Sequence, residues 1–200
     1  MDQSPRGRVA LLLPSADQSS LTAPAVYHAK FETSTGSFVI EVHRDWAPSG
    51  ADRFYYLVRN GFYDDTRFFR VIPGFMVQFG LSGDPKLSTV WRGAVIPDDS
   101  VKQTNARGFI TFAMAGPGSR TTQVFINYGN NSRLDVQGFA PFGQVTEGMD
   151  LVERIFSGSG EGPNQTRIRN EGNQYLDKEF PQLDKILRAY IVEDQPAGKS

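Results

Sequence analysis

The amino-acid sequence predicts a single, mainly β domain folded as a compact antiparallel sheet or barrel. Short apolar segments recur through its middle: RFFRV, FMVQF, GFITFAM, QVFINYG and FAPFGQV. Glycine, proline, asparagine and aspartate separate them, which is typical of short strands joined by tight turns. With 200 residues, of which 39% are hydrophobic, the chain is long enough to bury one substantial core.

The first part of the chain is predicted to be a flexible N-terminal arm over residues 1–25. This segment is polar, contains proline and serine, and shows no sustained hydrophobic period. The folded domain is then expected over residues 26–194. It begins with two strands, YHAKFE and SFVIEVH, in which apolar and polar side chains alternate.

A helix is predicted next, from about Pro48 to Asn60. Proline is favoured in a first helical turn, the apolar side chains of Phe54 and Val58 keep helical spacing, and Gly61 ends the pattern. After the apolar segments of the sheet, a second helix is expected at residues 148–155.

The last part of the domain should contain a loop, a short helix and a closing strand. SGSGEGPNQ has the composition of a loop, and residues 171–180 have the pattern of a short extra helix ended by Pro181. ILRAYIV then reads as the closing strand. Residues 156–183 as a whole suggest no function.

Charge and hydropathy exclude two kinds of partner. The chain has 21 Lys and Arg residues against 22 Asp and Glu residues, with no basic stripe of the kind that nucleic-acid binding needs. No apolar run approaches the roughly 18 residues of a membrane span. We therefore expect a protein that binds neither nucleic acid nor membrane. We also expect it to be a monomer.

The sequence is compatible with more than one cellular compartment. The apolar part of RGRVALLL is too short for the signal-peptide core of about 7–15 residues. The chain therefore reads as cytoplasmic, or as periplasmic or secreted if a longer leader has been removed.

The scarcity of reactive side chains limits the chemistry further. There is no cysteine, which removes thiol nucleophiles, disulfides and cysteine metal sites. Both histidines, His28 and His43, lie opposite the apolar face of alternating segments, so we expect them to face solvent. This pattern argues against a Ser-His-Asp triad or a histidine metal site, and we expect neither metal nor cofactor.

One arginine stands out because its neighbours are apolar. In FFRVIPGFMVQFG, a Pro-Gly turn separates two strand-like pieces, and only Arg70 and Gln78 are strongly polar. A buried, unpaired charge is costly, so Arg70 must reach solvent, pair, or face a pocket that uses its charge.

Three segments together resemble the cyclophilins, the peptidyl-prolyl cis–trans isomerases: RVIPGFMVQFG, GFITFAMAGPGSRTTQVFIN and LDVQGFAPFGQVTEGMDLVERI. The first is similar to the family's R-I-I-P-G-F-M-x-Q-x-G at almost every position. The resemblance runs from Val26 through Ile155, with the closing strand at Ile186–Val192. It implies a closed eight-stranded antiparallel barrel capped by two helices.

The resemblance also implies a role for Arg70. Rotation about an X–Pro bond is slow because amide resonance opposes it, with a barrier of about 18–20 kcal/mol. A fixed cationic donor aimed at the prolyl nitrogen would stabilise the twisted amide more than either planar isomer. Such a reaction needs no nucleophile, general base or cofactor, and its partners would be proline-containing peptides and unfolded proteins.

The other site residues follow from the same resemblance. Gln78 would act with Arg70, orienting it and binding the substrate backbone, while Gln123 and the Ala113 backbone would contact the peptide. The proline ring would lie in an apolar pocket made of Phe75, Met76, Phe125 and Leu134.

Three positions around this predicted pocket depart from the family pattern. Met114 stands where an asparagine is common, Arg133 where most members have tryptophan, and Phe139 where they have histidine, in a loop longer by one residue. Because cyclosporin-type inhibitors of the family rely on that tryptophan, the departures predict weak cyclosporin binding.

Two further function classes remain beside an active isomerase. The departures leave room for a proline-peptide binding module with little catalysis, whereas the intact Arg70, Phe75, Met76 and Gln78 favour the enzyme. A scaffold role for residues 156–183 has no positive sequence feature behind it.

Overall fold

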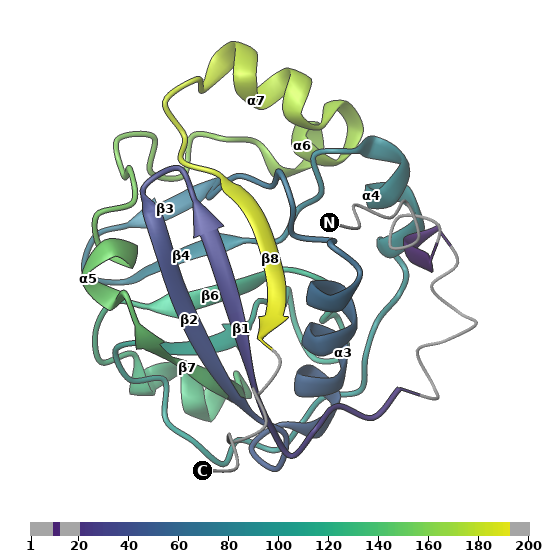
Figure 1. Ribbon diagram of the computed structural model, residues 1–200, viewed down its shortest axis with the longest axis vertical. Helices are drawn as coiled ribbons and strands as arrows, with labels where there is room; N and C mark the ends of the chain where they lie inside the picture. The colour runs from purple at the N-terminus through teal and green to yellow at the C-terminus, as the bar shows by residue number, and fades with distance from the viewer. Residues whose placement is uncertain (1–9, 13–20, 193–200) are drawn as a thin grey trace, which may run out of the picture.

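The computed structural model describes residues 10–12 and 21–192 and contains one curled antiparallel sheet of eight strands, in the order β3-β4-β6-β5-β7-β2-β1-β8 (Figure 1). The strands are β1 (Val26–Thr33), β2 (Gly36–His43), β3 (Arg70–Ile72), β4 (Met76–Phe79), β5 (Phe109–Phe112), β6 (Val124–Asn127), β7 (Pro141–Glu147) and β8 (Ile186–Val192). The mainly β fold is therefore confirmed.

The first hairpin shows how the alternating sequence specifies the sheet. In β1, Tyr27, Ala29 and Phe31 are buried, while the residues between them are partly exposed. β2 pairs with it along the whole length, from Val26 opposite His43 to Thr33 opposite Gly36. Because side chains alternate across a strand, one face of this hairpin forms the core and the other faces outward.

The helix α3 (Pro48–Arg59) packs against β7 and β8 and buries Phe54, Leu57 and Val58. Its first turn is held by Asp99, whose carboxylate accepts hydrogen bonds from the backbone N–H groups of Ser49 and Gly50. These donors have no partner inside a helix, so Asp99 satisfies them from a distant loop. The helix predicted for residues 48–60 is confirmed.

The second capping helix is shorter than the sequence pattern suggested. The helix α5 (Met149–Val152) forms a single turn against β2, within the predicted range of 148–155. Val152 and Ile155 are buried, whereas Leu151 is only partly buried.

The prediction of a closed barrel is wrong, because the edge strands β3 and β8 are not paired as a ladder. The two edges meet only just before β3, where Arg67 forms an isolated bridge with Lys185. Farther along, the N–H of Val71 in β3 donates to the carbonyl of Gly160. Gly160 belongs to the loop that precedes α6 (Gln165–Glu171). That loop covers the free edge of β3, and an edge covered in this way is protected from further pairing.

Three helices lie together beyond this edge (Figure 1). They are α4 (Pro85–Trp91), α6 (Gln165–Glu171) and α7 (Asn173–Glu179). The helix predicted near 171–180 corresponds to α7, whereas α4 and α6 were not predicted. A small second core of Phe69, Leu81, Ile168, Tyr175 and Leu176 holds α6 and α7 against the end of the sheet.

Most of the predicted N-terminal arm lies outside the described residues. Within the part that is described, Leu11 is completely buried, and its carbonyl accepts a hydrogen bond from the indole N–H of Trp91 at 2.9 Å. The hydroxyl of Tyr56 donates to the carbonyl of Ala10. Among the residues described, no helix has the length and apolar character needed to cross a membrane.

Candidate active site

A cavity of about 470 Å³ lies on the outer face of the sheet, above β4 and β6. Two-residue alternation divides these strands between two faces. Val77, Phe79 and Ile126 join the main core, whereas Met76 and Phe125 belong to a separate apolar cluster on the other side. The run FMVQF is apolar at every position except Gln78, because its strand is buried on both faces, as its burial pattern shows.

The apolar end of the cavity is formed by that separate cluster. Met76, Phe125 and Leu134 are buried there, with Phe75 and Phe139 packed against them. The rings of Phe125 and Phe139 meet edge to face, with centroids 5.9 Å apart. The result is a concave apolar surface that is accessible from the cavity.

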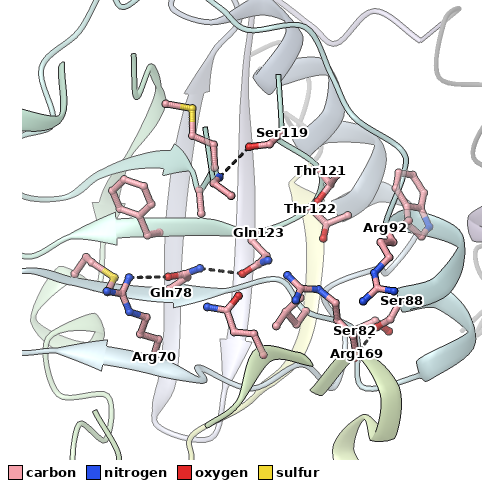
Figure 2. Close-up of a pocket in the computed structure, with 18 of the residues that line it drawn as sticks. Arg70, Gln78, Ser82, Ser88, Arg92, Ser119, Thr121, Thr122, Gln123 and Arg169 are labelled. Atoms are coloured by element: carbon pink, nitrogen blue, oxygen red, sulfur yellow. Dashed lines mark hydrogen bonds between the residues drawn. The ribbon is translucent and has the colours of Figure 1, made fainter. Parts of the chain in front are cut away.

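A row of polar side chains borders this apolar surface (Figure 2). Arg70 faces Gln78 across the β3–β4 hairpin, and its Nη1 donates to Gln78 Oε1 at 3.1 Å. The Nε2 of Gln78 donates in turn to Gln123 Oε1 at 2.9 Å. Gln78 is buried and Arg70 is 29% exposed, so the row presents its guanidinium to the cavity.

Arg70 also has an anionic partner that sequence reasoning missed. Its Nε donates to Glu161 Oε1 at 2.7 Å, and its Nη2 lies 2.5 Å from the same oxygen. Glu161 belongs to the loop that covers the edge of β3, 91 positions away in the chain. No local pattern indicates this contact; the lone acidic residue in SGSGEGPNQ is the only sequence feature at that place.

The loop carrying Leu134 and Phe139 is fixed by a buried polar network. Leu134 lies in the 3₁₀ helix η1 (Ser132–Gln137), and the Asp135 carboxylate accepts hydrogen bonds from Thr104 and from both nitrogens of Asn105. Asn105 is fully buried and also donates to the carbonyl of Phe139. Burial opposes ionisation of Asp135, but these hydrogen bonds outweigh it and lower the pKa of its carboxyl below the ordinary value of 3.8.

The predicted site residues, with one exception, line this one cavity: Arg70, Phe75, Met76, Gln78, Ala113, Met114, Gln123, Phe125, Leu134 and Phe139. The exception is Arg133, which is not part of the lining. Its guanidinium carbon lies 5.1 Å from the ring centroid of Phe75, a cation–π contact at the rim.

The far end of the cavity contains residues that were not predicted. Helices α4 and α6 contribute Arg92 and Arg169, and Ser82 and Ser88 lie beside them (Figure 2). The only sequence signal for α4 was Asp84-Pro85, an N-cap residue followed by proline, which begins many helices.

The two histidines lie elsewhere, on the outward face of the β1–β2 hairpin. His28 and His43 both contact the carboxylate of Glu41, at 3.1 and 2.7 Å, and their side chains are 36% and 24% exposed. His43 also stacks on Trp46. In the described part of the chain, no group of three or more His, Cys, Asp or Glu residues is arranged to hold a metal ion.

Comparison with known proteins assigns the fold and the motifs to one family. Residues 28–173 match the model of the cyclophilin type peptidyl-prolyl cis-trans isomerase/CLD family. The chain belongs to this family. The match begins in β1 and extends through α6, so it includes every described residue that lines the cavity.

Curated relatives include other cyclophilin-family isomerases. The chain is 32% identical to peptidyl-prolyl cis-trans isomerase-like 1 of Emericella nidulans over 167 residues, covering 82% of this chain and 93% of that protein. It is 35% identical to a peptidyl-prolyl cis-trans isomerase of Acinetobacter baylyi over 131 residues, covering 63% and 70% of the two chains.

A solved structure supports the fold. The crystal structure of a cyclophilin type peptidyl-prolyl cis-trans isomerase from Cryptosporidium parvum has a TM-score of 0.63 and 21% sequence identity to this chain. The comparison covers 85% of this chain and 99% of that one. The cyclophilin fold is thus present here with an open, curled sheet and helices.

Proposed function

We propose that the protein accelerates rotation about X–Pro bonds in flexible or unfolded protein segments, and that the reaction takes place in the cavity above β4 and β6. Family membership and the isomerase relatives support this activity. The observation that carries the choice of site is the position of the Arg70 guanidinium, held at the border of an apolar pocket by Gln78.

In this mechanism, the proline ring occupies the apolar end formed by Phe75, Met76, Phe125 and Leu134. The prolyl nitrogen becomes more electron-rich as the amide twists and loses resonance. Arg70 then donates to that nitrogen more strongly in the twisted state than in either planar isomer, which lowers the barrier. No proton is transferred and no bond is broken.

The peptide backbone is held by the polar border. Gln78 accepts from Arg70 and donates to Gln123, so the three side chains are oriented before substrate arrives. The N–H of Ala113 is already used by the carbonyl of Gln123, which leaves the Ala113 carbonyl as the group offered to the substrate. Met114 and Phe139 complete the walls.

The test is isomerisation of a short X–Pro peptide, followed by NMR exchange or a protease-coupled assay. We expect acceleration by the unmodified protein and a loss of at least about tenfold in kcat/KM for Arg70→Ala, because removing one well-placed donor from such a site typically costs about 2.7–4 kcal/mol. Arg107→Ala is the matched control. Arg107 also pairs with a glutamate but does not line the cavity.

The same assay should give a nearly flat kcat/KM from about pH 6 to 8. Arginine stays charged throughout this range, and both histidines lie outside the cavity. Turnover by Arg70→Ala equal to that of the unmodified protein would reject the mechanism. If neither protein accelerates the reaction but both bind the peptide, the chain is a proline-peptide binding module instead, a function for which the departures at Met114, Arg133 and Phe139 leave room.

We further propose that the protein is a monomer and that it binds cyclosporin weakly. We also propose that it binds neither nucleic acid nor membranes. The near balance of charge argues against nucleic acid. The inhibitor proposal rests on Arg133, because its guanidinium lies over Phe75 at the rim, where the family commonly has a tryptophan.

A further inference from the structure

Two arginines face each other at the end of the cavity that lies away from Arg70. Arg92 is the C-cap residue of α4, and Arg169 lies in the last turn of α6. Both line the cavity, and Figure 2 shows their side chains extending to the same end of it, with Gln123 between them and Arg70.

Neither guanidinium has a hydrogen-bond or ion-pair partner among the described residues. Arg44, Arg107 and Arg167, by contrast, each pair with a carboxylate at 2.6–2.8 Å. Burial lowers the pKa of Arg169, and the positive charge of Arg92 lowers it further. The fold therefore holds two like charges close together without neutralising them.

The helix ends explain only part of this arrangement. Basic residues are favoured at helix C-termini because the carbonyl ends carry partial negative charge. That effect accounts for an arginine on each helix, but not for both side chains entering the same cavity. Seven-residue helices also have small dipoles.

The segments that carry the two arginines, α4 and α6, are packed tightly together. Ile168, next to Arg169, is buried in the second core, and the N–H of Asn173 donates to the carbonyl of Gly83 at 3.0 Å. A Cβ atom at Gly172 would lie 2.1 Å from the Gly83 oxygen, so the backbones meet where only glycine fits. The loop entering α4 is thereby fixed against the end of α6.

We infer that this end of the cavity is an anion subsite, which recognises a carboxylate or phosphate group on a substrate residue two to four positions from the proline. Two guanidinium groups suit both anions because each can donate two parallel hydrogen bonds. Ser82 and Ser88 line the same end. The inference rests on the proposed isomerase function and names the substrate class of that same site.

The spacing follows from the chain itself. Ser82 is four residues beyond Gln78, and four extended residues span at most about 13–14 Å. A substrate lying extended along the cavity covers the same distance with the same number of residues. The acidic side chain must therefore lie within about four positions of the proline, on one side of it.

The experiment uses peptides with one X–Pro bond and a glutamate, glutamine, lysine, phosphoserine or serine at the second, third or fourth position on either side. We expect kcat/KM to be about tenfold higher for glutamate than for glutamine at one of these positions, which is the factor that one modest charge-assisted hydrogen bond provides. Phosphoserine should likewise exceed serine, and lysine should be the poorest substrate. A preference confined to phosphoserine would assign the subsite to phosphate.

The variants to compare are Arg92→Gln, Arg169→Gln and their combination. In the double variant, the ratio of kcat/KM for the glutamate peptide to kcat/KM for the glutamine peptide should fall to about one. Replacing both arginines by lysine should restore part of the ratio, because lysine keeps the charge but loses the paired donors. Arg154→Gln, which removes an exposed arginine paired with Asp150, should keep the full ratio.

Failure of this inference can be separated from failure of the proposed function. Equal turnover of acidic and neutral peptides by the unmodified protein, or a preference that survives in the double variant, overturns the anion subsite while leaving the isomerase intact. If no peptide is turned over, dissociation constants from calorimetry for the glutamate and glutamine peptides decide the subsite in the same way.

Discussion

At the scale of single residues, the environment of Arg70 explains how a permanent charge can stand among apolar neighbours. Gln78 accepts from Nη1, Glu161 contacts both Nε and Nη2, and the side chain remains 29% exposed to solvent. The charge is neither buried nor unpaired, so the large desolvation cost of an isolated ion does not arise. The remaining N–H groups of the guanidinium can serve a substrate.

Glu161 is expected to act as a positioning residue for Arg70. Glu161→Ala should lower kcat by about threefold to fivefold with little change in KM, because a partly exposed ion pair contributes up to about 1 kcal/mol. Glu161→Gln should recover most of the rate, since its amide oxygen still accepts from Nε. Steady-state isomerisation kinetics provide the measurement.

A faster Glu161→Ala protein would contradict this role. It would mean that the carboxylate occupies the edge of the guanidinium that the substrate needs, and that its removal frees Arg70. Glu153→Ala is the control, because it breaks a similar exposed ion pair, with Arg107, outside the cavity.

Arg133 should decide inhibitor affinity rather than turnover. An indole offers a flat apolar face and a fixed N–H donor at the rim, whereas an arginine must be ordered at the cost of rotamer entropy. We expect Arg133→Trp to bind cyclosporin at least about tenfold more tightly, the gain of one hydrogen bond with aromatic contact. Calorimetric titration of both proteins measures it.

The rate of proline-peptide isomerisation should not rise to match that gain, because a small substrate relies on the apolar floor rather than on the rim. Tight cyclosporin binding by the unmodified protein, or no gain from Arg133→Trp, would refute the argument.

At the scale of elements, η1 shows how one polar network places two pocket side chains. Asp135 joins η1 to the segment at Thr104 and Asn105, and Asn105 reaches on to Thr111, Asn127 and the carbonyl of Phe139. Leu134 and Phe139 flank this anchor and form part of the apolar pocket. The rigidity of the pocket wall thus depends on a carboxylate that is not itself in the cavity.

Asp135→Asn should lower the free energy of unfolding by about 1.5–3 kcal/mol at neutral pH, because an ionised acceptor of several hydrogen bonds is lost. The pKa of Asp135 is depressed in the folded state, so its contribution is fully present above the unfolded value of 3.8 and is lost as pH falls through the folded pKa. The difference between the two proteins should therefore be constant above about pH 5 and shrink below pH 4.

Urea unfolding at pH 7, 5 and 3.5 measures this difference. Asp150→Asn is the control, since that carboxylate is exposed and belongs to a surface ion pair. An unfolding difference that stays the same at every pH would show that Asp135 does not stabilise the fold through its charge.

At the scale of the whole molecule, the described chain contains three apolar clusters, each with a different structural role. The main core fills the curl of the sheet beneath α3, the second core attaches α6 and α7, and the third forms the floor of the cavity. The cavity lies between the second and third clusters, so it has one apolar end and one cationic end. This separation allows a single fold to carry both the proposed proline pocket and the proposed anion subsite.

The sequence by itself determined the features that depend on neighbours along the chain. Alternation in β1 and β2 and the helical spacing in α3 predicted those elements, because strand and helix periods are local properties. The strand β4 was predicted as one of the short apolar segments between turn residues. In RVIPGFMVQFG, the Pro-Gly turn brings Arg70 opposite Gln78 and places Met76 on the same face. The motif thus specified the central part of the candidate site.

Only the tertiary structure decided the features that join distant segments. The sheet stays open because the loop at Gly160, rather than β8, covers the edge of β3, and the same loop brings Glu161 to Arg70 across 91 positions. Arg92 and Arg169 lie at the same end of the cavity because α4 and α6 pack against each other. Such contacts depend on how long-range packing folds the chain back on itself, and no local period carries that information.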